Sequence, residues 1–307
     1  MKEYEFQLPE GSLFYEELPG KGARITRFHG LSGKVVIPDE VPGEGSDLLP
    51  VTKIGKKAFL SKKYLRSVTV PETVSEVSDW AFAYCDSLRE VSFLGRDVSF
   101  GRAIFMECPG LRSVSFGKER VSSQGADGSG ALMAAAVTQM ESSYLLDARE
   151  AGSREWLAKW DARMLAILNA ADDDGYSKQI LCGEEDYESA DLEMYLSNSR
   201  KRKVRLLLLR LNFQEGLGQG MRETLRSYLV EHTKGRRSEE TWQVIRDECG
   251  DRRELYQLFA EIGCLTRENA PAIISEIREE DPEMKAFFLQ YQANHFENQD
   301  FFGDLEL

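Results

Sequence analysis

The sequence lacks the features of a membrane-spanning chain and of an exported, disulfide-bonded chain. No apolar run approaches the ~18–20 residues that cross a bilayer, and no apolar segment with a cleavage site follows Met1, as a signal peptide would require. The five cysteines form no C-x-x-C pair, so reduced thiols are the simplest interpretation. We therefore expect a cytoplasmic protein with no membrane span, which would be extracellular only if a leader had been removed.

Catalytic motifs are scarce as well. The histidines His29, His232 and His295 are far apart in the sequence, and no G-x-S-x-G elbow, H-E-x-x-H zinc motif or cysteine-nucleophile signature occurs. The glycines at positions 216, 218 and 220 lack the spacing and the Lys-Ser/Thr of a phosphate-binding loop, so we interpret them as a helix connector. These absences favour a non-enzymatic protein without cofactors.

Acidic residues outnumber basic residues, but unevenly along the chain. The formal net charge is −13. Residues 1–121 hold 17 basic and 17 acidic side chains, whereas residues 122–307 hold 22 basic and 35 acidic ones. Such asymmetry indicates separate domains. Within the acidic half, residues 200–237 form a basic island, with 11 basic and 3 acidic side chains.

A 23-residue period is the strongest signal in the sequence. Leu65, Leu88 and Leu111 each begin the pattern Leu-x-x-Val-x-Val/Phe, in which alternate residues of a short strand point inward. The same period relates the pairs Ala58-Phe59, Ala81-Phe82 and Ile104-Phe105 and the residues Ile54, Val77 and Phe100. A unit of this length cannot bury its own apolar side, so equivalent positions must stack on one another. The period therefore predicts a solenoid.

These repeats resemble the BspA-like leucine-rich repeat family over about residues 25–121. The resemblance is carried by Val51-Thr52-Lys53-Ile54-Gly55-x-x-Ala58-Phe59, by Leu65-Arg66-Ser67-Val68-Thr69-Val70-Pro71, and by a degenerate half-unit at Gly33–Pro38. It implies a binding surface rather than a reaction. Members of this family are often exported and carry more repeats, so an exported surface adhesin is an alternative function.

Two further segments complete the domain plan. Residues 1–24 alternate apolar and polar side chains around Pro9-Glu10-Gly11 and predict a hairpin that covers the first coil. Residues 122–130 are rich in Ser and Gly and have the composition of a flexible linker. We therefore predict an α+β chain of two domains. A short, β-rich leucine-rich-repeat solenoid spans residues 1–121, and an all-α helical-hairpin repeat domain spans residues 131–307.

After the predicted linker, the apolar period changes from 2 to 3.6 residues. A broad apolar face runs from Trp156 to Leu168, and stripes at i, i+3, i+4 and i+7 begin at Val204, Leu255 and Met284. Shorter helices are expected near 189–198, 221–232, 239–248 and 268–279. Connectors such as Cys249-Gly250 and Asp281-Pro282 indicate antiparallel helical pairs. The last two pairs loosely resemble ankyrin-type or other α-solenoid repeats, although the stripe offsets of 51 and 29 residues are unequal.

Stacking the coils at the ~4.8 Å strand spacing places three arginines in one column beside polar neighbours. Three like charges repel one another unless an anion lies nearby. One interpretation is a groove for an acidic peptide or for the acidic half of the same chain, and the other is that long basic side chains simply extend into water. The candidate protein-binding residues are Arg66, Ser67, Thr69, Arg89, Glu90, Ser92, Arg112, Ser113 and Ser115.

Seven carboxylates within residues 172–188 suggest a different class of site. Hard cations such as Ca²⁺ or Mg²⁺ prefer carboxylate oxygens, so a metal-dependent enzyme with its site in residues 155–195 is another alternative function. Its ligands would be Asp172, Asp173, Asp174, Glu184, Glu185 and Asp186. Gly175 follows the third aspartate directly, which does not fit the EF-hand spacing. A solvated loop whose acids cap helix N-termini explains the same residues.

The basic island also has two explanations. Its side chains would contact phosphates, or they would complement the acidic loop of the same domain. No nucleic-acid-binding motif accompanies the island, so we do not expect nucleic acid as a partner. We predict a non-enzymatic protein–protein interaction module or adaptor, built from two repeat domains, whose partner is another protein.

Overall fold

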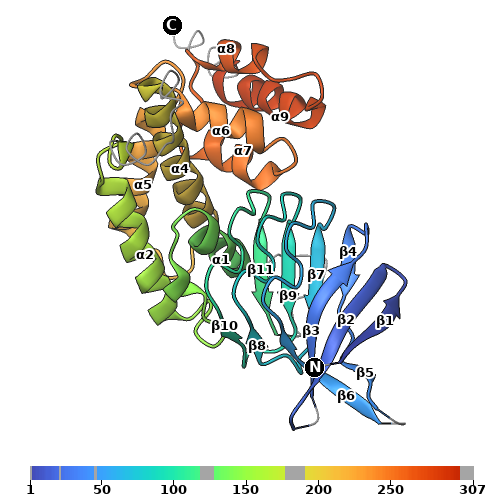
Figure 1. The fold of residues 1–307 in the computed structure, drawn as a ribbon. Helices are drawn as coiled ribbons and strands as arrows, with labels where there is room; N and C mark the ends of the chain where they lie inside the picture. The colour runs from blue at the N-terminus through green and yellow to red at the C-terminus, as the bar shows by residue number, and fades with distance from the viewer. Residues whose placement is uncertain (1, 21, 45–46, 118–127, 177–190, 298–307) are drawn as a thin grey trace, which may run out of the picture. The chain divides into compact units, whose positions relative to one another are not determined.

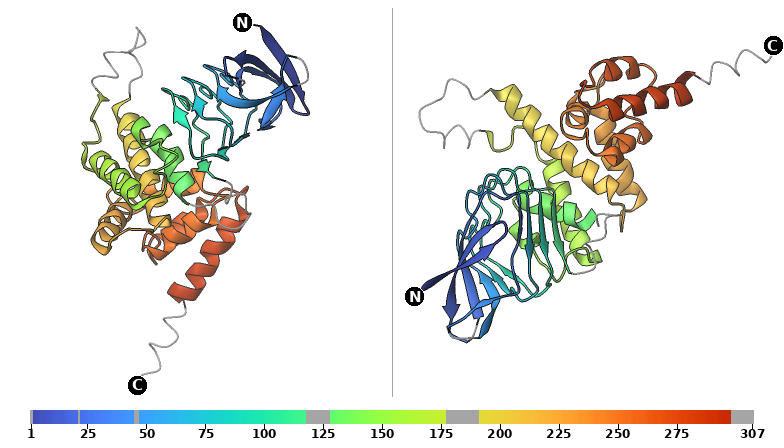
Figure 2. Two further views of the ribbon diagram at one scale, coloured as in Figure 1. Left: turned by 90° about the horizontal axis from the view of Figure 1, so that it is seen from below. Right: turned by 90° about the vertical axis from the view of Figure 1, so that its right-hand side faces the viewer.

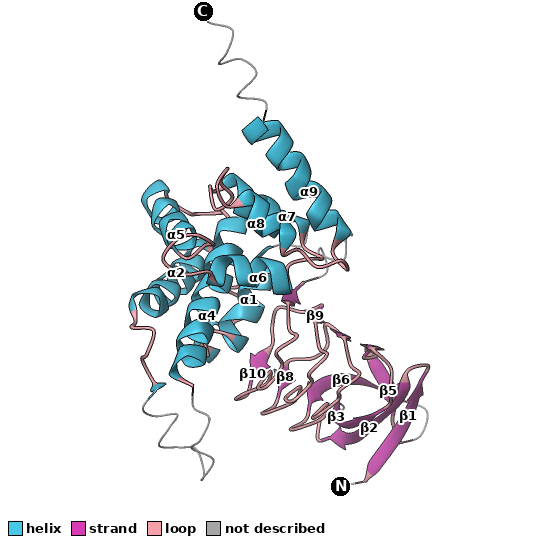
Figure 3. Cartoon of the chain, turned by 90° about the horizontal axis from the view of Figure 1, so that it is seen from above, coloured by secondary structure: helices cyan, strands magenta, loops and turns pink. Residues whose placement is uncertain are grey.

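The computed structural model describes residues 2–20, 22–44, 47–117, 128–176 and 191–297. They divide into two compact units, Met1–Arg163 and Met164–Leu307. The described strands all lie in the first unit, and six of the described α-helices belong wholly to the second (Figures 1 and 3). A strand-rich region followed by a helical region is therefore confirmed, in agreement with the predicted fold class.

A parallel ladder of short strands follows the 23-residue period. Its strands, in order, are β11 (Ser113–Phe116), β9 (Glu90–Phe93), β7 (Ser67–Val70) and β4 (Lys34–Val36), seen side by side in Figure 1. Val68, Val91 and Val114 pair in register, and all three are buried. Val35 of the degenerate unit pairs with Val68. The predicted inward column is therefore present.

A second set of parallel strands forms the other side of the repeats. β6 (Leu48–Ile54) pairs with β8 (Glu76–Val77), and β8 pairs with β10 (Ser99–Phe100). Ile54, Val77 and Phe100 lie in register, as the period predicts. β5 (Glu40–Pro42) pairs antiparallel with the start of β6. This hairpin lengthens the first offset, so that Lys34 pairs with Ser67 rather than with a residue 23 positions away.

A ladder of phenylalanine rings fills the space between the strands. Phe28, Phe59, Phe82 and Phe105 stack with centroid separations of 5.5, 5.0 and 5.7 Å, and all four are buried. The backbone beside the rings is bonded in the same order, because Phe59 N donates to Ala81 O at 2.8 Å and Phe82 N donates to Ile104 O at 3.1 Å. Offset stacking at this separation adds to the free energy of ring burial. The ladder therefore ties each repeat to the next.

Left-handed backbone recurs with the same period in the turns beside this ladder. One column, with φ between 52° and 63°, contains Lys57, Trp80 and Ala103, and a second, with φ between 52° and 58°, contains Ser61, Tyr84 and Glu107. A non-glycine residue in this region costs about 1–2 kcal/mol. Inter-repeat hydrogen bonds such as Trp80 N to Arg102 O at 3.0 Å stabilise the turns against this cost.

Two cysteines occupy equivalent positions in adjacent repeats. The Sγ atoms of Cys85 and Cys108 donate to the carbonyl oxygens of Phe59 and Phe82 at 3.1 and 3.0 Å. Both thiols are free and buried. The hydrogen bond to Cys85 and burial raise the pKa of Cys108, which keeps that sulfur in its unreactive thiol form. These two residues act as small hydrophobic donors inside the stack.

The N-terminal cap has one more strand than predicted. β1 (Glu3–Leu8) and β2 (Gly11–Leu18) form the expected hairpin. β3 (Gly22–His29) adds a third antiparallel strand and then pairs in parallel with β6. Its buried residues Ala23, Ile25 and Phe28 face the first repeat. The cap is therefore continuous with the repeat sheet.

The predicted linker is wrong in its last part, because residues 128–130 are helical. The remainder, 122–127, lies outside the described residues. α1 (Gly128–Thr138) packs against β11, and a Cβ at Gly130 would lie only 2.6 Å from Ser113 Oγ. Small residues here allow a helix to approach a strand closely. The Gly/Ser composition therefore serves packing at this point and not flexibility.

The chain after α1 completes a C-terminal cap for the repeats. It includes η2 (Ser143–Leu145) and the start of α2 (Arg154–Asn169). Trp156 Nε1 donates to Leu145 O at 2.8 Å, and Trp160 Nε1 donates to Leu132 O at 2.9 Å. The compact unit consequently continues to Arg163, beyond the expected boundary at 122–130. Whether the chain divides functionally at that boundary stays a prediction.

The second compact unit contains the remaining helices. They are α4 (Leu192–Asn212), α5 (Gln219–Glu231), α6 (Glu240–Glu248), α7 (Arg253–Glu261), α8 (Ala270–Ser275) and α9 (Pro282–Gln292), followed by the π-helical turn η4 (Ala293–Glu297). Two expected helices near 189–198 and 204–211 are one helix, α4 (Figure 2), because no Gly or Pro interrupts it. α8 is shorter than the expected 268–279. No helix among the described residues is long and apolar enough to cross a membrane.

The two last helical pairs share a 29-residue offset in both of their helices. Val244 and Ile245 of α6 correspond to Ile273 and Ile274 of α8, and Leu255 and Phe259 of α7 correspond to Met284 and Phe288 of α9. All eight side chains are buried. The offset found in the sequence for the second helices therefore extends to the first helices of each pair.

Candidate binding surface

The predicted arginine column lies on the exposed ends of the β7, β9 and β11 segments. Arg89 N donates to Arg66 O, and Arg112 N donates to Arg89 O, both at 2.8 Å, so the three residues follow one another at strand spacing. All three side chains are exposed. Arg66 and Arg89 have no ion-pair partner among the residues that the structure describes. Two arginine side chains from adjacent repeats are therefore available to an anionic ligand.

The polar neighbours of the column form two rows across the strands. Ser67, Glu90 and Ser113 pair in register, as do Thr69, Ser92 and Ser115. Ser115 Oγ donates to Ser92 Oγ at 3.2 Å. The prediction that these neighbours are exposed holds only for Glu90, because the side chains with hydroxyl groups are all half-buried: Ser67, Thr69, Ser92, Ser113 and Ser115. Ser113 in addition lies beside Gly130 of α1.

The proposed metal ligands are only partly described. Asp172 accepts from Arg200 Nε and Lys203 Nζ, each at 2.7 Å. Burial raises the pKa of this carboxyl, but the hydrogen bonds and charges of Lys203 and Arg200 outweigh burial and lower it overall. Asp173 and Asp174 are exposed, whereas Glu184, Glu185 and Asp186 lie outside the described residues. Within the described part of the chain, no group of three His, Cys, Asp or Glu side chains is placed to hold a metal ion.

Part of the basic island is engaged within the helical unit. Besides the pairs with Asp172, Arg205 donates to both carboxylate oxygens of Glu248 at 2.7 and 2.6 Å. Arg226 Nε donates to Ile262 O at 2.7 Å. Lys234 Nζ lies 2.6 Å from Glu276. These contacts favour the intramolecular explanation of the island over phosphate binding.

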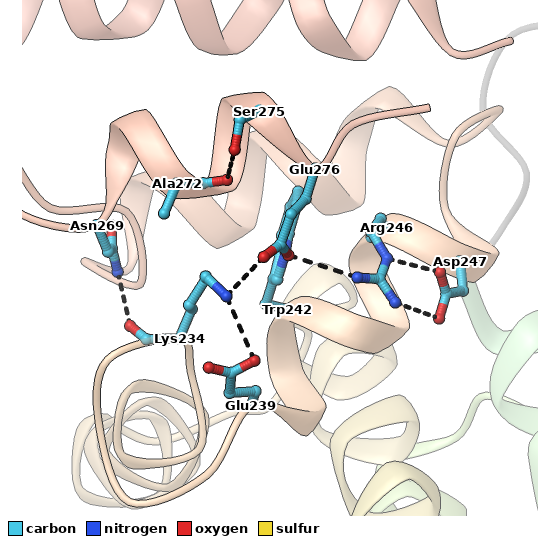
Figure 4. A network of polar contacts seen from close by, with 9 residues as sticks. All are labelled: Lys234, Glu239, Trp242, Arg246, Asp247, Asn269, Ala272, Ser275 and Glu276. Carbon is cyan, nitrogen blue, oxygen red and sulfur yellow. Dashed lines mark hydrogen bonds and ion pairs between the residues drawn. The ribbon is translucent and has the colours of Figure 1, made fainter. Parts of the chain in front are cut away.

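A polar network joins α6 to α8 in the helical unit (Figure 4). Glu276 accepts from Trp242 Nε1 at 2.7 Å, from Lys234 Nζ at 2.6 Å and from Arg246 Nη1 at 3.4 Å. Burial raises the pKa of Glu276, but the hydrogen bonds of Lys234 and Trp242 and the charge of Arg246 lower it overall. With its carboxylate satisfied, the network is structural and offers no free acid or base.

Replacing Glu276 by glutamine is expected to lower the free energy of unfolding by about 1–2 kcal/mol at neutral pH. A carboxyl with a lowered folded pKa stabilises the fold above its unfolded value and ceases to do so as pH falls through the folded value. The difference between wild type and Glu276→Gln should therefore be full at neutral pH, begin to shrink as pH falls to the unfolded value of about 4.3, and disappear only below the lower folded pKa. Urea denaturation at several pH values measures it. A difference that persists in acid would contradict the ionic origin.

A cleft that the sequence did not reveal lies at the end of the repeat stack. It has a volume of about 500 Å³ and is bounded by residues 101–109 of the last repeat and by α1 and the following turn. Apolar atoms of Phe105, Met106, Val137 and Leu146 line it, and its charged residues are Glu107 and Glu141. Met106 is 42% exposed. The prediction assigned residues 131–307 to a separate helical domain and so did not place residues 137–146 beside the last repeat.

Comparison with known proteins agrees with the repeat geometry. Residues 49–126 match the family model described as "BspA type Leucine rich repeat region (6 copies)". No curated protein matches the chain.

Three solved structures illustrate the likeness. A leucine rich cell surface protein from Faecalibacterium prausnitzii is 30% identical over 37% of this chain and 32% of its own, with a TM-score of 0.32. A leucine-rich repeat protein from Bacteroides capillosus is 25% identical over 37% of this chain and 99% of its own, with a TM-score of 0.30. The leucine rich repeat protein of T. pallidum is 28% identical over 36% and 53%, with a TM-score of 0.30. This chain thus spans about a third of the first of these proteins. Residues 49–126 of the chain carry BspA-type leucine-rich repeats.

Proposed function

We propose that this chain is a non-enzymatic protein-binding module or adaptor whose repeat unit binds an acidic segment of a partner protein. Leucine-rich-repeat proteins generally mediate protein–protein interaction or surface adhesion. The observation that carries the proposal is the pair Arg66 and Arg89, exposed, stacked in register and without an ion-pair partner among the described residues. Paired guanidinium groups bind carboxylates through charge-assisted hydrogen bonds.

The rows of hydroxyl groups beside the arginines support the same surface. Thr69, Ser92 and Ser115 accept or donate hydrogen bonds, and their alternation with buried valines keeps them on the outer face. An extended acidic peptide lying across β7 and β9 would meet both kinds of group. We also propose that the helical unit supplies a second binding surface, built from helical-hairpin repeats. The 29-residue offset between its last two helical pairs supports this repeat organisation.

A direct test uses the full chain and a fluorescent acidic peptide with the sequence Gly-Glu-Glu-Asp-Tyr-Glu, taken from residues 183–188 of this chain. Fluorescence anisotropy measures binding to wild type and to the double variant Arg66→Glu/Arg89→Glu. We expect the variant to bind about tenfold more weakly, because two attractive contacts become repulsive. The same variant should gain affinity for a Lys-rich peptide.

The matched control is Lys62→Glu/Lys63→Glu, which makes the same change in net charge on the repeat that contains Arg66. It should leave binding of the acidic peptide within about twofold of wild type at moderate salt, since separated surface charges are screened. Equal losses in both double variants would mean that net charge alone attracts the peptide, and the proposal would then be rejected.

A further inference from the structure

Three backbone N–H groups of the last repeat have no following repeat to donate to among the residues that the structure describes. Trp80, Phe82 and Tyr84 donate through their backbone nitrogens to the carbonyls of Arg102, Ile104 and Met106 at 3.0, 3.1 and 2.8 Å. Lys57, Phe59 and Ser61 donate in the same way to the carbonyls of the repeat that follows them, at Asp79, Ala81 and Ala83. The equivalent donors of the last repeat are the nitrogens of Ala103, Phe105 and Glu107. None of the three has a hydrogen-bond partner among the described residues.

These three residues line the cleft at the end of the stack. The opposite wall, from Val137 to Leu146, makes no backbone hydrogen bond to residues 101–109 within the described chain. By contrast, the neighbouring strand β11 is covered by α1. Within the described residues, the last repeat therefore has one covered edge and one edge whose backbone donors are unpaired. An unpaired row of backbone donors is the structural basis for adding an extended segment.

The lining of the cleft restricts which segment fits. Met106, Val137 and Leu146 provide apolar contact for one or two side chains. The charged lining residues, Glu107 and Glu141, are both acidic and exposed, and neither forms an ion pair within the described residues. An acidic segment would be repelled here. A segment with an apolar centre and Lys or Arg beside it would be attracted.

We propose that this cleft binds an extended, basic and apolar segment of a partner protein by backbone addition to the last repeat. Carbonyl groups of alternate residues in that segment accept from Ala103, Phe105 and Glu107, as the carbonyls of residues 102, 104 and 106 do one repeat earlier. Its apolar side chain packs on Met106 and Val137, and its basic side chains face Glu107 and Glu141. This surface is separate from the arginine column and takes a ligand of opposite charge.

The test uses the full chain and a fluorescein-labelled peptide, Gly-Arg-Ala-Ile-Phe-Met-Lys. Its first six residues copy positions 101–106, which already accept the equivalent hydrogen bonds in the stack. Anisotropy should show saturable binding of the L-peptide and at least about tenfold weaker binding of its D-enantiomer, which has the same charge and composition but the wrong hand. Unlabelled peptide should compete with the label.

Charge reversal tests the acidic rim. Glu107→Lys/Glu141→Lys should weaken binding of this peptide about tenfold and strengthen binding of a version with Glu in place of Arg and Lys. The matched control, Glu10→Lys/Glu40→Lys, makes the same change in charge at the other end of the repeats and should leave the affinity unchanged. Equal effects of the two double variants would overturn the proposal.

Amide hydrogen exchange locates the contact. In the free chain the amides of Ala103, Phe105 and Glu107 should exchange faster than those of Trp80, Phe82 and Tyr84, and the L-peptide should slow the first three selectively. Binding without this protection would place the peptide elsewhere and overturn the proposal. Concentration-dependent dimerisation that Glu107→Lys/Glu141→Lys abolishes would identify the occupant as a second copy of this chain, which would also overturn it.

Discussion

Phe82→Ala is expected to lower the free energy of unfolding of the repeat unit by about 3–5 kcal/mol, the usual cost of removing a buried ring. Phe82 is fully buried between Phe59 and Phe105, with centroids 5.0 and 5.7 Å away. Its loss would leave a cavity in the middle of the ladder and remove two ring contacts at once. In a repeat array each repeat is stabilised by contacts with its immediate neighbours only. We therefore expect the repeats before and after Phe82 to unfold less cooperatively in the variant.

Guanidinium denaturation followed by circular dichroism measures this loss in the full chain. Phe82→Leu is the control, because it keeps most of the apolar volume while removing the ring, and it should lose less than half as much stability. The two exposed aromatic residues of the same repeat, Trp80 and Tyr84, provide a second comparison, since their replacement by alanine should change stability by less than about 1 kcal/mol. A loss of that small size for Phe82→Ala would show that the ring stack contributes little.

Trp160→Ala is expected to have a comparable effect, about 3–5 kcal/mol. Trp160 is fully buried, and its indole nitrogen donates to Leu132 O in α1. Removing it would empty a large volume behind α1 and leave that helix poorly held against β11. The effect should therefore appear in the repeat unit, although Trp160 lies well beyond the predicted domain boundary.

The change in stability is measured by thermal unfolding of the full chain, with Trp160→Phe as the matched variant. Phenylalanine keeps an aromatic ring but cannot donate the hydrogen bond, so we expect a loss of about 1–3 kcal/mol for it. Hydrogen exchange of the amides in β9 and β11 then reports where stability is lost. If those strands keep wild-type protection in Trp160→Ala, residues 128–163 do not cap the repeats.

The repeat region was predictable because the period in the sequence equals the offset between paired residues of adjacent strands. Val68 and Val91 are 23 residues apart in the sequence and pair with each other in the ladder. The alternation of side chains along each strand then determines which side chains are buried. The phenylalanine column followed in the same way, since equivalent positions of a stack must lie above one another. The arginine column was placed by the same argument.

The C-terminal cap and the cleft were not predictable from composition. Glycine and serine, as at 128–130, are typical both of a flexible linker and of a helix that approaches a strand closely. Only the structure distinguishes the two, because a Cβ at Gly130 would lie 2.6 Å from Ser113 Oγ. The binding site proposed in the cleft depends on the backbone N–H groups of Ala103, Phe105 and Glu107. Whether such groups are paired cannot be predicted from the identity of the side chains. α4 was divided in two because its apolar stripe is interrupted by the polar residues Ser197–Lys203, although the helix continues through them.

The paired columns of left-handed turns bear on how such a chain can change in length. The same left-handed backbone conformation recurs in each repeat, at positions 57, 80 and 103 and again at 61, 84 and 107. Unequal recombination that adds or removes 23 codons between equivalent turns would preserve every pairing in both ladders, whereas a one-codon insertion within a turn would displace the ladder on one side of it. Genes for this fold can therefore gain or lose whole 23-residue repeats while α1 still packs against the last repeat.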